Sequence, residues 1–344
     1  MRICSAFDEG FRLDESSVRS AVLVSNSRHA KVYRCCFNLP EFASEQFYCV
    51  KILKADGSFL EHQLSLFTRI SQVICDGEVL CDCEMDYKIA DCGTLPLLHF
   101  GVIPANVCKK NNETLYVITP WFEGHTLHYL ITKAIQSKRT VTIFEALVLL
   151  RAVVTSMYNF SRCDDKAYLV HQDIKPSNIF ISPNSQPRAV IVDLDTAFFL
   201  DEVPQSVPCG SFGYTAPESI SHNNRWPNET IDIFSFGVVA HEIFTGHWPY
   251  PFPPRLGDDL LFWTSYFRQK DALYISQNLP SDIRSLIESC VSLSPYNRPS
   301  HECLVKHLDI LLDRYAQNQE AFCPLQSGAT SSWMLANEAI ADTF

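Results

Sequence analysis

Short apolar segments separated by polar breaks occupy the first third of the chain. Segments enriched in β-branched and aromatic residues predict β-strands, and they fall at residues 21–24, 31–34, 47–53, 95–101 and 114–119. Residues 59–70 instead place apolar side chains at the spacing of an α-helix. We therefore predict a strand-rich unit with one main helix.

Helical spacing dominates from Leu127 onward. Further helices are predicted at residues 142–160, 231–244, 258–267, 281–291 and 301–315. Strand-like segments in this part are mainly the two apolar runs around a polar loop near residue 173. The pattern favours an α+β protein with a small β-rich lobe, about 18–119, and a larger, mainly helical lobe, about 123–315.

Three segments lie outside this plan: an amino-terminal extension at 1–17, a Cys/acidic insertion at about 71–93 and a tail at 316–344. The insertion interleaves Asp and Glu with Cys75, Cys81, Cys83 and Cys92. Thiolates and carboxylates bind metals, but the insertion lacks the paired two-residue Cys spacings of structural zinc sites. We expect a solvated acidic insertion and keep a zinc site as the alternative.

Composition indicates a globular chain. Of 344 residues, 47% are hydrophobic and 19% charged, which is ordinary for a folded protein. We find no apolar run of about 18 residues that would span a bilayer, and residues 1–10 become acidic too soon for a secretory signal. The expectation is a soluble intracellular protein, cytoplasmic rather than nuclear, with no membrane partner.

Net charge limits the classes of partner that we expect, and cysteine content bears on the redox state of the thiols. The net charge of −11 argues against a nucleic-acid partner, which requires clustered Lys and Arg. The chain has 14 cysteines, but it is neither small nor visibly secreted, so a disulfide framework is not expected. We predict reduced thiols, mostly buried as small apolar side chains.

One loop concentrates the candidate chemistry. Residues 168–181 read YLVHQDIKPSNIFI, which places Asp173, Lys175 and Asn178 between two apolar runs. The strand-like run AVIVD then ends in Asp193. In phosphoryl transfer, one carboxylate accepts or orients a hydroxyl proton, a lysine neutralises phosphate charge, and an amide with a second carboxylate holds Mg²⁺. The order of these four side chains therefore indicates phosphoryl transfer.

This constellation resembles the catalytic loop and metal-binding segment of the eukaryotic protein kinase family. The family's His-Arg-Asp appears here as HQD at 171–173, and its Asp-Phe-Gly as DLD at 193–195. The resemblance implies a two-lobed kinase fold, Asp173 as the catalytic base, and ATP with Mg²⁺ held by Asn178 and Asp193. Lys175 matches the serine/threonine branch of the family.

The resemblance extends to the phosphate-binding lysine of the β-rich lobe. The segment YCVK ends in Lys51, at the position whose lysine binds the α- and β-phosphates and pairs with a Glu on the next helix. Glu61 is the best partner because it precedes Leu64 by three residues and could turn inward on that helical face. A lysine on an exposed strand position and a solvated Glu61 remain the alternatives.

The nucleotide-covering loop departs most from the family. Alignment on Val32 leaves SNSRHA, from Ser25 to Ala30, where the family has Gly-x-Gly-x-x-Gly. Glycine there lets the backbone approach phosphates closely and adopt positive φ. We expect a loop that can still close over ATP but hinders the approach of its amides, with reduced nucleotide affinity.

The segment from Thr114 to Leu127 resembles the fifth strand and the hinge of the family. Thr119 would guard the rear of the adenine pocket. The adenine would meet backbone groups near Pro120, Trp121 and Phe122, and Pro120 keeps its carbonyl although it has no N–H. Apolar contacts to the base would come from Val32, Cys49 and Phe180.

Two departures concern regulation and metal binding. Gln172 stands where many kinases have the Arg that pairs with a phosphorylated activation segment, and a neutral Gln cannot form that ion pair. Phosphorylation control is therefore not expected, although Ser206, Ser211 and Thr215 are available. Asp195 replaces the glycine of the metal segment. Asp tolerates left-handed backbone, so either the turn survives or the extra carboxylate changes metal affinity.

Residues 210–218, GSFGYTAPE, resemble the end of a kinase activation segment. By this resemblance Glu218 would pair with Arg298, Asp232 would bind the backbone of the catalytic loop, and Thr215 would contact the catalytic Asp. Phosphotransferases that act on small molecules generally lack this segment, so it favours a protein substrate.

The leading hypothesis is an ATP- and Mg²⁺-dependent serine/threonine protein kinase. The second hypothesis is a pseudokinase, a kinase-shaped scaffold that binds partners with weak or no catalysis, motivated by the glycine-free loop and Asp195. A third is a small-molecule kinase. The sequence gives no indication of the oligomeric state.

Overall fold

A computed structural model of the chain describes most residues between 18 and 317. The described ranges are 18–27, 30–38, 42, 46–53, 57–74, 93–103, 114–137, 141–162, 167–183, 186–202, 210–220, 228–251, 260–268 and 273–317. The chain divides into two compact units, Met1–Phe122 and Glu123–Phe344. The predicted extension and nearly all of the predicted tail and insertion, with its four cysteines and the zinc alternative, lie outside the described residues.

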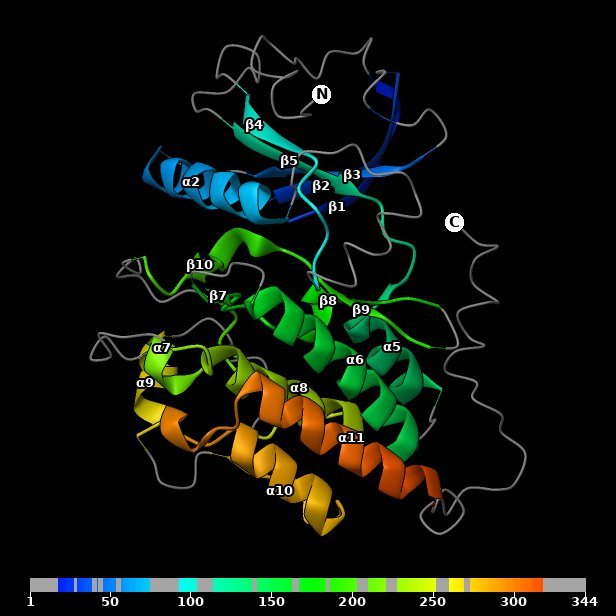
Figure 1. The fold of residues 1–344 in the computed structure, drawn as a ribbon, viewed down its shortest axis with the longest axis vertical. Coiled ribbons are helices and arrows are strands. Elements are labelled where there is room, and N and C mark those ends of the chain that lie inside the picture. The colour runs from blue at the N-terminus through cyan, green and yellow to red at the C-terminus, as the bar shows by residue number, and fades with distance from the viewer. Residues whose placement is uncertain are drawn as a thin grey trace. The chain divides into compact units, whose positions relative to one another are not determined.

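The first unit is built on a five-stranded sheet with the order β1-β2-β3-β5-β4, in which every neighbouring pair is antiparallel (Figure 1). The strands are β1 Val18–Asn26, β2 Ala30–Phe37, β3 Tyr48–Leu53, β4 His99–Ile103 and β5 Thr114–Pro120. Strand β3 lies between β2 and β5, so its residues are fixed by neighbours on both sides.

Helix α2, Gly57–Ile74, packs against this sheet. Leu60, Phe67 and Ile70 are buried at helical spacing, and the ring of Phe67 meets Phe100 of β4 edge-on at 5.9 Å. The predicted helix is confirmed. Its end lies further on, because residues 71–74, which we assigned to the insertion, continue the helix.

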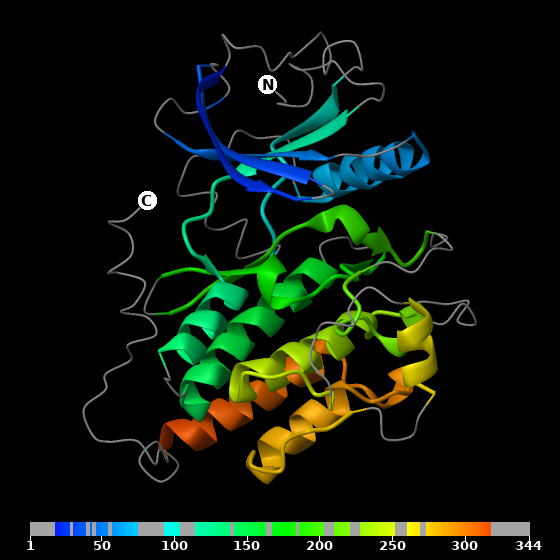
Figure 2. The same ribbon diagram turned by 180° about the vertical axis from the view of Figure 1, so that it is seen from behind.

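The second unit is mainly helical, as Figures 1 and 2 show. Its helices are α5 Leu127–Gln136, α6 Ile143–Ser161, α7 Pro217–Ile220, α8 Ile231–Thr245, α9 Leu260–Tyr266, α10 Ser281–Cys290 and α11 His301–Gln317. The helices predicted from residue 142 onward are thus confirmed, with small differences at their ends. The mixed α+β fold class is confirmed as well.

Short strands and 3₁₀ turns carry the polar loop of this unit. Strands β6 His125–Thr126, β8 Ile179–Ile181 and β9 Ala189–Ile191 form one sheet, and β7 Leu169–Val170 pairs with β10 Phe198–Phe199. The 3₁₀ turns are η1 Pro176–Asn178, η2 Leu194–Thr196 and η4 Pro295–Asn297. The loop of interest therefore runs between β7 and β8.

Helix α6 begins at a capping box and ends in the core. The Thr142 hydroxyl accepts from the Glu145 N–H at 3.1 Å, and the Glu145 carboxylate accepts from the Thr142 N–H at 3.0 Å, which satisfies otherwise unpaired amides of the first turn. The helix packs against α8, α11 and β9, with side chains such as Leu150 and Val153 fully buried.

The same helix is long and apolar enough to cross a membrane by length and composition alone, and half of it is buried within the fold. Our expectation that no segment reaches this length was therefore wrong for Ile143–Ser161. Core helices of water-soluble proteins pass the same test when they are apolar on most faces.

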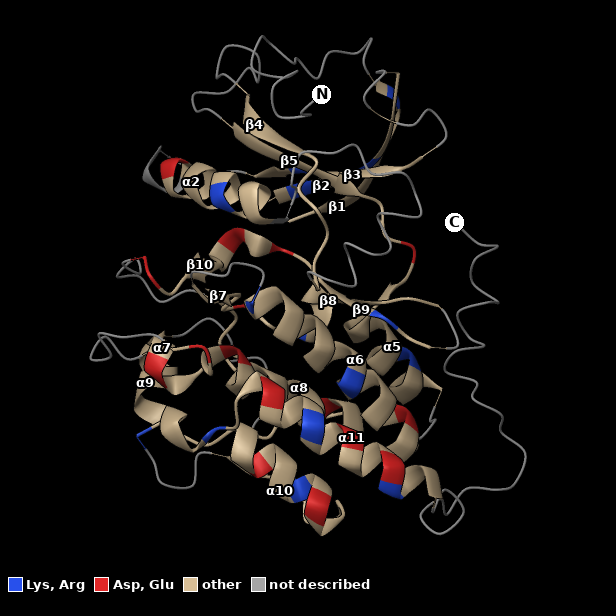
Figure 3. Ribbon diagram, viewed as in Figure 1, with Lys and Arg blue, Asp and Glu red and all other residues tan. Residues whose placement is uncertain are grey.

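Buried thiols and mixed surface charge match the composition. Among the described residues, Cys35, Cys36 and Cys290 are buried and not in disulfides. Acidic and basic residues are interspersed along α10 and α11 (Figure 3), and some form exposed pairs such as Lys306–Glu302 at 2.7 Å. An exposed pair of this kind contributes little to stability, because solvent and salt screen it.

Candidate functional site

A buried carboxylate anchors the polar loop after β7. Asp232, in the first turn of α8, accepts from the N–H of His171 at 2.7 Å and from the N–H of Gln172 at 2.9 Å. Burial raises the pKa of Asp232, while these bonds oppose the rise. The predicted contact of Asp232 with the loop backbone is confirmed.

Gln172 has a left-handed backbone, with φ 67°, and its carbonyl lies close to Gly210. A Cβ atom on Gly210 would come within 2.5 Å of the Gln172 oxygen, and Gly210 itself has φ 95°. Both the close approach and the positive φ require glycine there. The loop and the segment that begins at Gly210 are thus packed backbone to backbone.

The carboxylate of Asp173 is held by three groups. The Lys175 Nζ lies 2.7 Å from Oδ2, the Asn178 Nδ2 donates to the same oxygen at 2.9 Å, and the Ser211 N–H donates to Oδ1 at 2.8 Å. Asp173 is 9% exposed. A carboxylate held by three donors is fixed in orientation.

His171 ties this loop to the strand that leads to Asp193. Its ring is fully buried; Nδ1 accepts from the Asp173 N–H at 3.2 Å, so Nε2 is the protonated nitrogen that donates to the Val192 carbonyl at 3.0 Å. The hydroxyl of Thr196 donates to the His171 carbonyl at 3.0 Å. These bonds fix the segment around Asp193 relative to Asp173.

Asp193 and Asn178 have the features of cation ligands. Asp193 has a left-handed backbone, φ 72° and ψ 71°, just before η2, and the Val192 N–H donates to the Asn178 carbonyl at 2.9 Å. The Asn178 Nδ2 bonds both the carbonyl and the carboxylate of Asp173, so its Oδ1 is the atom left for a cation. One amide and one carboxylate oxygen suit Mg²⁺, which completes its shell with phosphate and water.

Ser211, not Thr215, meets the carboxylate of Asp173. The Ser211 hydroxyl accepts from the Lys175 Nζ at 2.7 Å, while its N–H binds Asp173. Thr215 is buried, and its hydroxyl has no hydrogen-bond partner among the described residues. The predicted contact of Thr215 with Asp173 was therefore wrong, because Ser211, earlier in the same segment, makes it.

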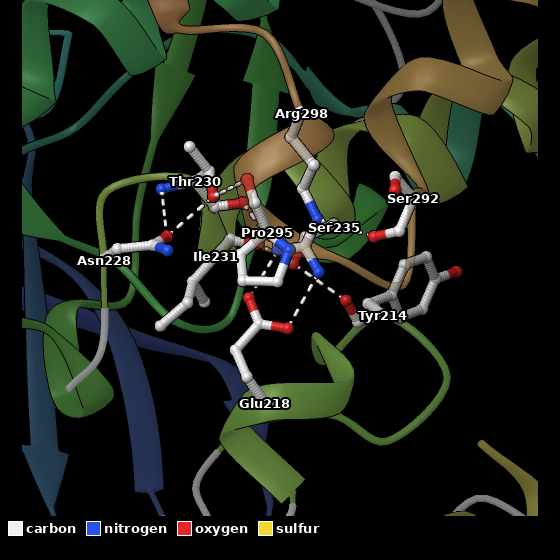
Figure 4. Close-up of polar contacts among 9 residues, drawn as sticks. All are labelled: Tyr214, Glu218, Asn228, Thr230, Ile231, Ser235, Ser292, Pro295 and Arg298. Carbon is white, nitrogen blue, oxygen red and sulfur yellow. Dashed lines mark hydrogen bonds and ion pairs between the residues drawn. The ribbon is translucent and has the colours of Figure 1, made fainter. Parts of the chain in front are cut away.

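An ion pair fixes the end of this segment (Figure 4). The two guanidinium NH groups of Arg298 bind the two carboxylate oxygens of Glu218, at 2.8 Å for Nη2 and Oε2. The side chains are 0% and 4% exposed. Arg298 also donates to the carbonyls of Ser292 at 2.9 Å and Thr230 at 3.1 Å. The predicted Glu218–Arg298 pair is confirmed.

Lys51 of the first unit lies on the central strand β3, half-buried, opposite Val32 of β2 and Val117 of β5. Both neighbouring strands hold its backbone, so the lysine extends from the middle strand of the sheet. The prediction that Lys51 stands on a strand is confirmed.

Glu61 does not turn inward as expected. It is exposed and makes no ion pair among the described residues, whereas Gln63 is fully buried. Successive helix residues are rotated by about 100°, which places Gln63 with Leu60 and Phe67 on the inner stripe of α2 and Glu61 off it. The inner polar residue of this helix is therefore Gln63, which the search for a carboxylate overlooked.

Cys49 and Thr119 face each other across β3 and β5. Burial raises the pKa of the Cys49 thiol, and a hydrogen bond with Thr119 partly opposes that rise. The Trp121 N–H donates to the Phe47 carbonyl at 3.0 Å, so this amide is already satisfied. The guanidinium of Arg34 lies 3.7 Å from the centre of the Phe47 ring, where it attracts the π face.

The turn between β1 and β2 closes through a serine instead of a glycine. The Ser27 N–H donates to the Ala30 carbonyl at 2.9 Å, and the Ser27 hydroxyl accepts from the Ala30 N–H at 3.0 Å. Ser25 is exposed opposite Val32, and Ala30 is buried. The side chain of Ser27 thus binds the Ala30 amide across the turn.

The remaining predicted contacts to the base have these positions: Phe122 and Trp121 are half-buried at the end of the first unit, and Phe180 is half-buried on β8 of the second. Each unit is thus described with its own share of the predicted nucleotide contacts.

Comparison with known proteins decides the family. The family model of the protein kinase domain matches residues 95–308. The chain belongs to the protein kinase domain family. Similar proteins include serine/threonine-protein kinase PknD of Protochlamydia amoebophila, 26% identical over 258 residues that cover 67% of this chain and 25% of that protein.

Two other kinases are similar over shorter stretches. Mitogen-activated protein kinase kinase 2 of Arabidopsis thaliana is 29% identical over 147 residues, 41% of this chain and 39% of that protein. The Raf homolog serine/threonine-protein kinase of Caenorhabditis elegans is 25% identical over 213 residues, 60% of this chain and 26% of that protein. The chain thus spans well under half the length of these kinases.

The kinase resemblance left Ser211 and Gln63 unnoticed. Ser211 was noted only as a possible phosphorylation site. It stands close before Ala216 in the segment that packs on the loop of Asp173 and Lys175. Gln63 is neutral and gave no charge signal. Burial at helical spacing, at residues 60, 63 and 67, was the signal that could have identified it.

Proposed function

We propose that this kinase domain is a serine/threonine protein kinase that transfers the γ-phosphoryl group of ATP to a hydroxyl on a protein. The observation that carries the proposal is the fixed carboxylate of Asp173, held by Lys175, Asn178 and the Ser211 N–H. A pre-oriented carboxylate can accept or orient the acceptor proton, a contribution of roughly 10²–10⁴-fold.

The other residues divide the work around that carboxylate. Lys175 neutralises charge on the transferred group and binds Asp173 at 2.7 Å. Asn178 and Asp193 would hold Mg²⁺, which when bound with ATP offsets the charge of the phosphates. Lys51 would bind the α- and β-phosphates from the first unit. Most of the catalysis is then positioning and charge stabilisation.

A protein substrate is proposed because the segment from Gly210 to Glu218 is built in and anchored by Arg298. Ser211 in this segment binds Asp173 through its N–H, so the segment runs beside the proposed catalytic carboxylate. Such a segment offers an extended peptide a fixed surface beside Asp173.

A pseudokinase is the second candidate, and one observation favours it. Ser27 closes the nucleotide-covering turn with its own hydroxyl, so the turn offers fewer open amides to phosphates than glycines would. Asp195 adds a carboxylate one residue beyond Leu194, near the expected metal. Both features would lower affinity for Mg-ATP and leave partner binding as the function.

A transfer assay with matched variants tests the proposal. Pure protein, Mg-ATP and a generic protein substrate should give phosphoserine or phosphothreonine. Asp173→Asn should lower kcat at least 100-fold with little change in the KM for ATP, because it removes the base, whereas Lys51→Ala should raise the KM for ATP. Thr215→Ser, which preserves a buried hydroxyl away from Asp173, is the control. Transfer that is absent, or equal in wild type and Asp173→Asn, refutes the kinase assignment.

A further inference from the structure

The segment beside Asp173 is a tight turn at Ser211–Thr215. The N–H groups of Tyr214 and Thr215 donate to the Ser211 carbonyl at 3.0 and 3.2 Å. Gly213 within this turn has φ 96°, and a Cβ there would lie 2.6 Å from the ring of Trp248. The turn therefore rests directly on Trp248, with no room for a side chain.

Hydrogen bonds from α8 and the chain that follows it hold the same turn. The hydroxyl of Tyr250 donates to the Gly213 carbonyl at 2.7 Å. The hydroxyl of Ser235 donates to the Tyr214 carbonyl at 2.8 Å (Figure 4). Both carbonyls point inward and are satisfied by buried side chains, since Ser235 is 1% and Tyr250 6% exposed. The backbone is thus fixed on its inner side.

Hydrogen bonds between side chains also hold this turn. The Tyr214 hydroxyl donates to the Glu242 Oε2 at 2.6 Å and accepts from the Trp248 Nε1–H at 2.9 Å. Burial raises the pKa values of Glu242 and Tyr214, so the contact lies in a site of low polarity where a hydrogen bond is strong. We call Tyr214, Ser235, Glu242, Trp248 and Tyr250 the clamp.

The clamp rests on a packed aromatic cluster. Tyr250 lies 5.0 Å from Trp263 and 5.9 Å from Tyr266, measured between ring centres, and Trp263 is fully buried. Close packing of this kind allows few alternative positions. The clamp therefore transmits the position of α8 to the Ser211 turn without slack.

We propose that Glu242 and Trp248 are positioning residues for the phosphoacceptor. They act through Tyr214 to set Ser211, whose N–H and hydroxyl in turn orient Asp173 and Lys175. The proposal rests on the proposed kinase function for its effect on turnover. It predicts that the clamp controls transfer to a protein hydroxyl and leaves nucleotide binding unchanged.

Two variants weaken the clamp. Tyr214→Phe deletes only the hydroxyl that joins Glu242 to Trp248, and Trp248→Phe removes the indole N–H donor together with part of the ring that packs on the turn. Because a misplacement of about 1 Å can cost about 100-fold, each should lower kcat for peptide phosphorylation by about 10- to 100-fold. The KM for ATP should not change, because none of the clamp residues is assigned to the nucleotide. Glu242→Gln keeps an oxygen that accepts from the Tyr214 hydroxyl and should therefore retain most of the wild-type kcat for peptide phosphorylation.

Amide hydrogen exchange gives a readout that needs no catalysis. The Ser211 N–H, bonded to Asp173, should exchange at least tenfold faster in Tyr214→Phe than in the wild type. The matched control is Tyr129→Phe on α5, a half-buried tyrosine stacked on His125, which should leave Ser211 exchange and peptide kcat unchanged. If Tyr214→Phe fails to fold, Trp248→Phe carries the same comparison.

Two results would overturn the proposal. One is wild-type exchange at Ser211 in both clamp variants, and the other is a peptide kcat that stays at the wild-type value. A wild type that transfers phosphate to no hydroxyl would refute the proposed function instead, and the exchange comparison would still decide whether the clamp sets Ser211.

Discussion

Single residues in this chain often bind two structural elements at once. Arg298 binds Glu218 of α7 and the carbonyls of Ser292 and Thr230, and its guanidinium lies 5.1 Å from the ring centre of Phe234. The Nε, Nη1 and Nη2 atoms of Arg298 each donate to an oxygen. Such a residue is expensive to remove alone, because its partner stays buried and charged.

This leads to a prediction at the residue scale. Arg298→Met should lower the free energy of unfolding by about 3–5 kcal/mol, the usual cost of leaving one member of a buried pair uncompensated. Urea denaturation followed by circular dichroism would measure it. The double variant Glu218→Leu with Arg298→Met should recover part of the loss, since no buried charge then remains. A loss below about 1 kcal/mol in the single variant would contradict the buried-pair account.

At the scale of elements, regular segments followed from periodicity, while contacts between segments did not. Helices such as α8 were predicted almost to the residue because their apolar spacing is local. The fixed carboxylate of Asp173 could be predicted from the spacing of Lys175 and Asn178 on one loop. Ser211 could not, because its approach depends on how a distant turn packs. Glu61 was misplaced because its helical phase was taken from Leu64, which is only half-buried, and not from the buried Leu60 and Phe67.

Helix α11 carries a titratable group at its buried first residue. His301 is 4% exposed, and burial lowers its pKa to about 4. The unfolded chain, with an ordinary histidine pKa, binds a proton near pH 6.5 that the folded chain does not accept until about pH 4. Stability from this site is therefore present above pH 6.5 and is lost as the pH falls from 6.5 towards 4.

Measured between pH 7 and pH 5, this site should cost the wild type about 2 kcal/mol of unfolding free energy, at about 1.4 kcal/mol per unit. His301→Leu should remove that part of the pH dependence. The control is His307→Leu at an exposed position of the same helix, which should keep the wild-type slope. Equal slopes for wild type and His301→Leu, in urea titrations at each pH, would contradict the assignment.

At the scale of the whole molecule, the two units carry different parts of one proposed reaction. The first unit holds Lys51 and the serine-closed turn, and the second holds Asp173, Asn178 and Asp193. Because the chain covers only 25–39% of the length of the relatives compared above, those kinases include much sequence with no counterpart here. Nucleotide binding is the property that would require both units, so it tests the molecule as a whole.

Mg-ATP should stabilise the protein against heat if both units contribute ligands. At ATP concentrations near 100 times Kd the gain is about 2.7 kcal/mol, which corresponds to several degrees at about 2–4 °C per kcal/mol. Asp193→Asn should remove the part of the shift that depends on Mg²⁺, and Lys51→Ala should lower the shift with and without metal, since it acts on the phosphates. Thr215→Ser serves again as the control. No shift at millimolar Mg-ATP would mean that the serine-closed turn does not accept the phosphates, and the pseudokinase would then be the function to pursue.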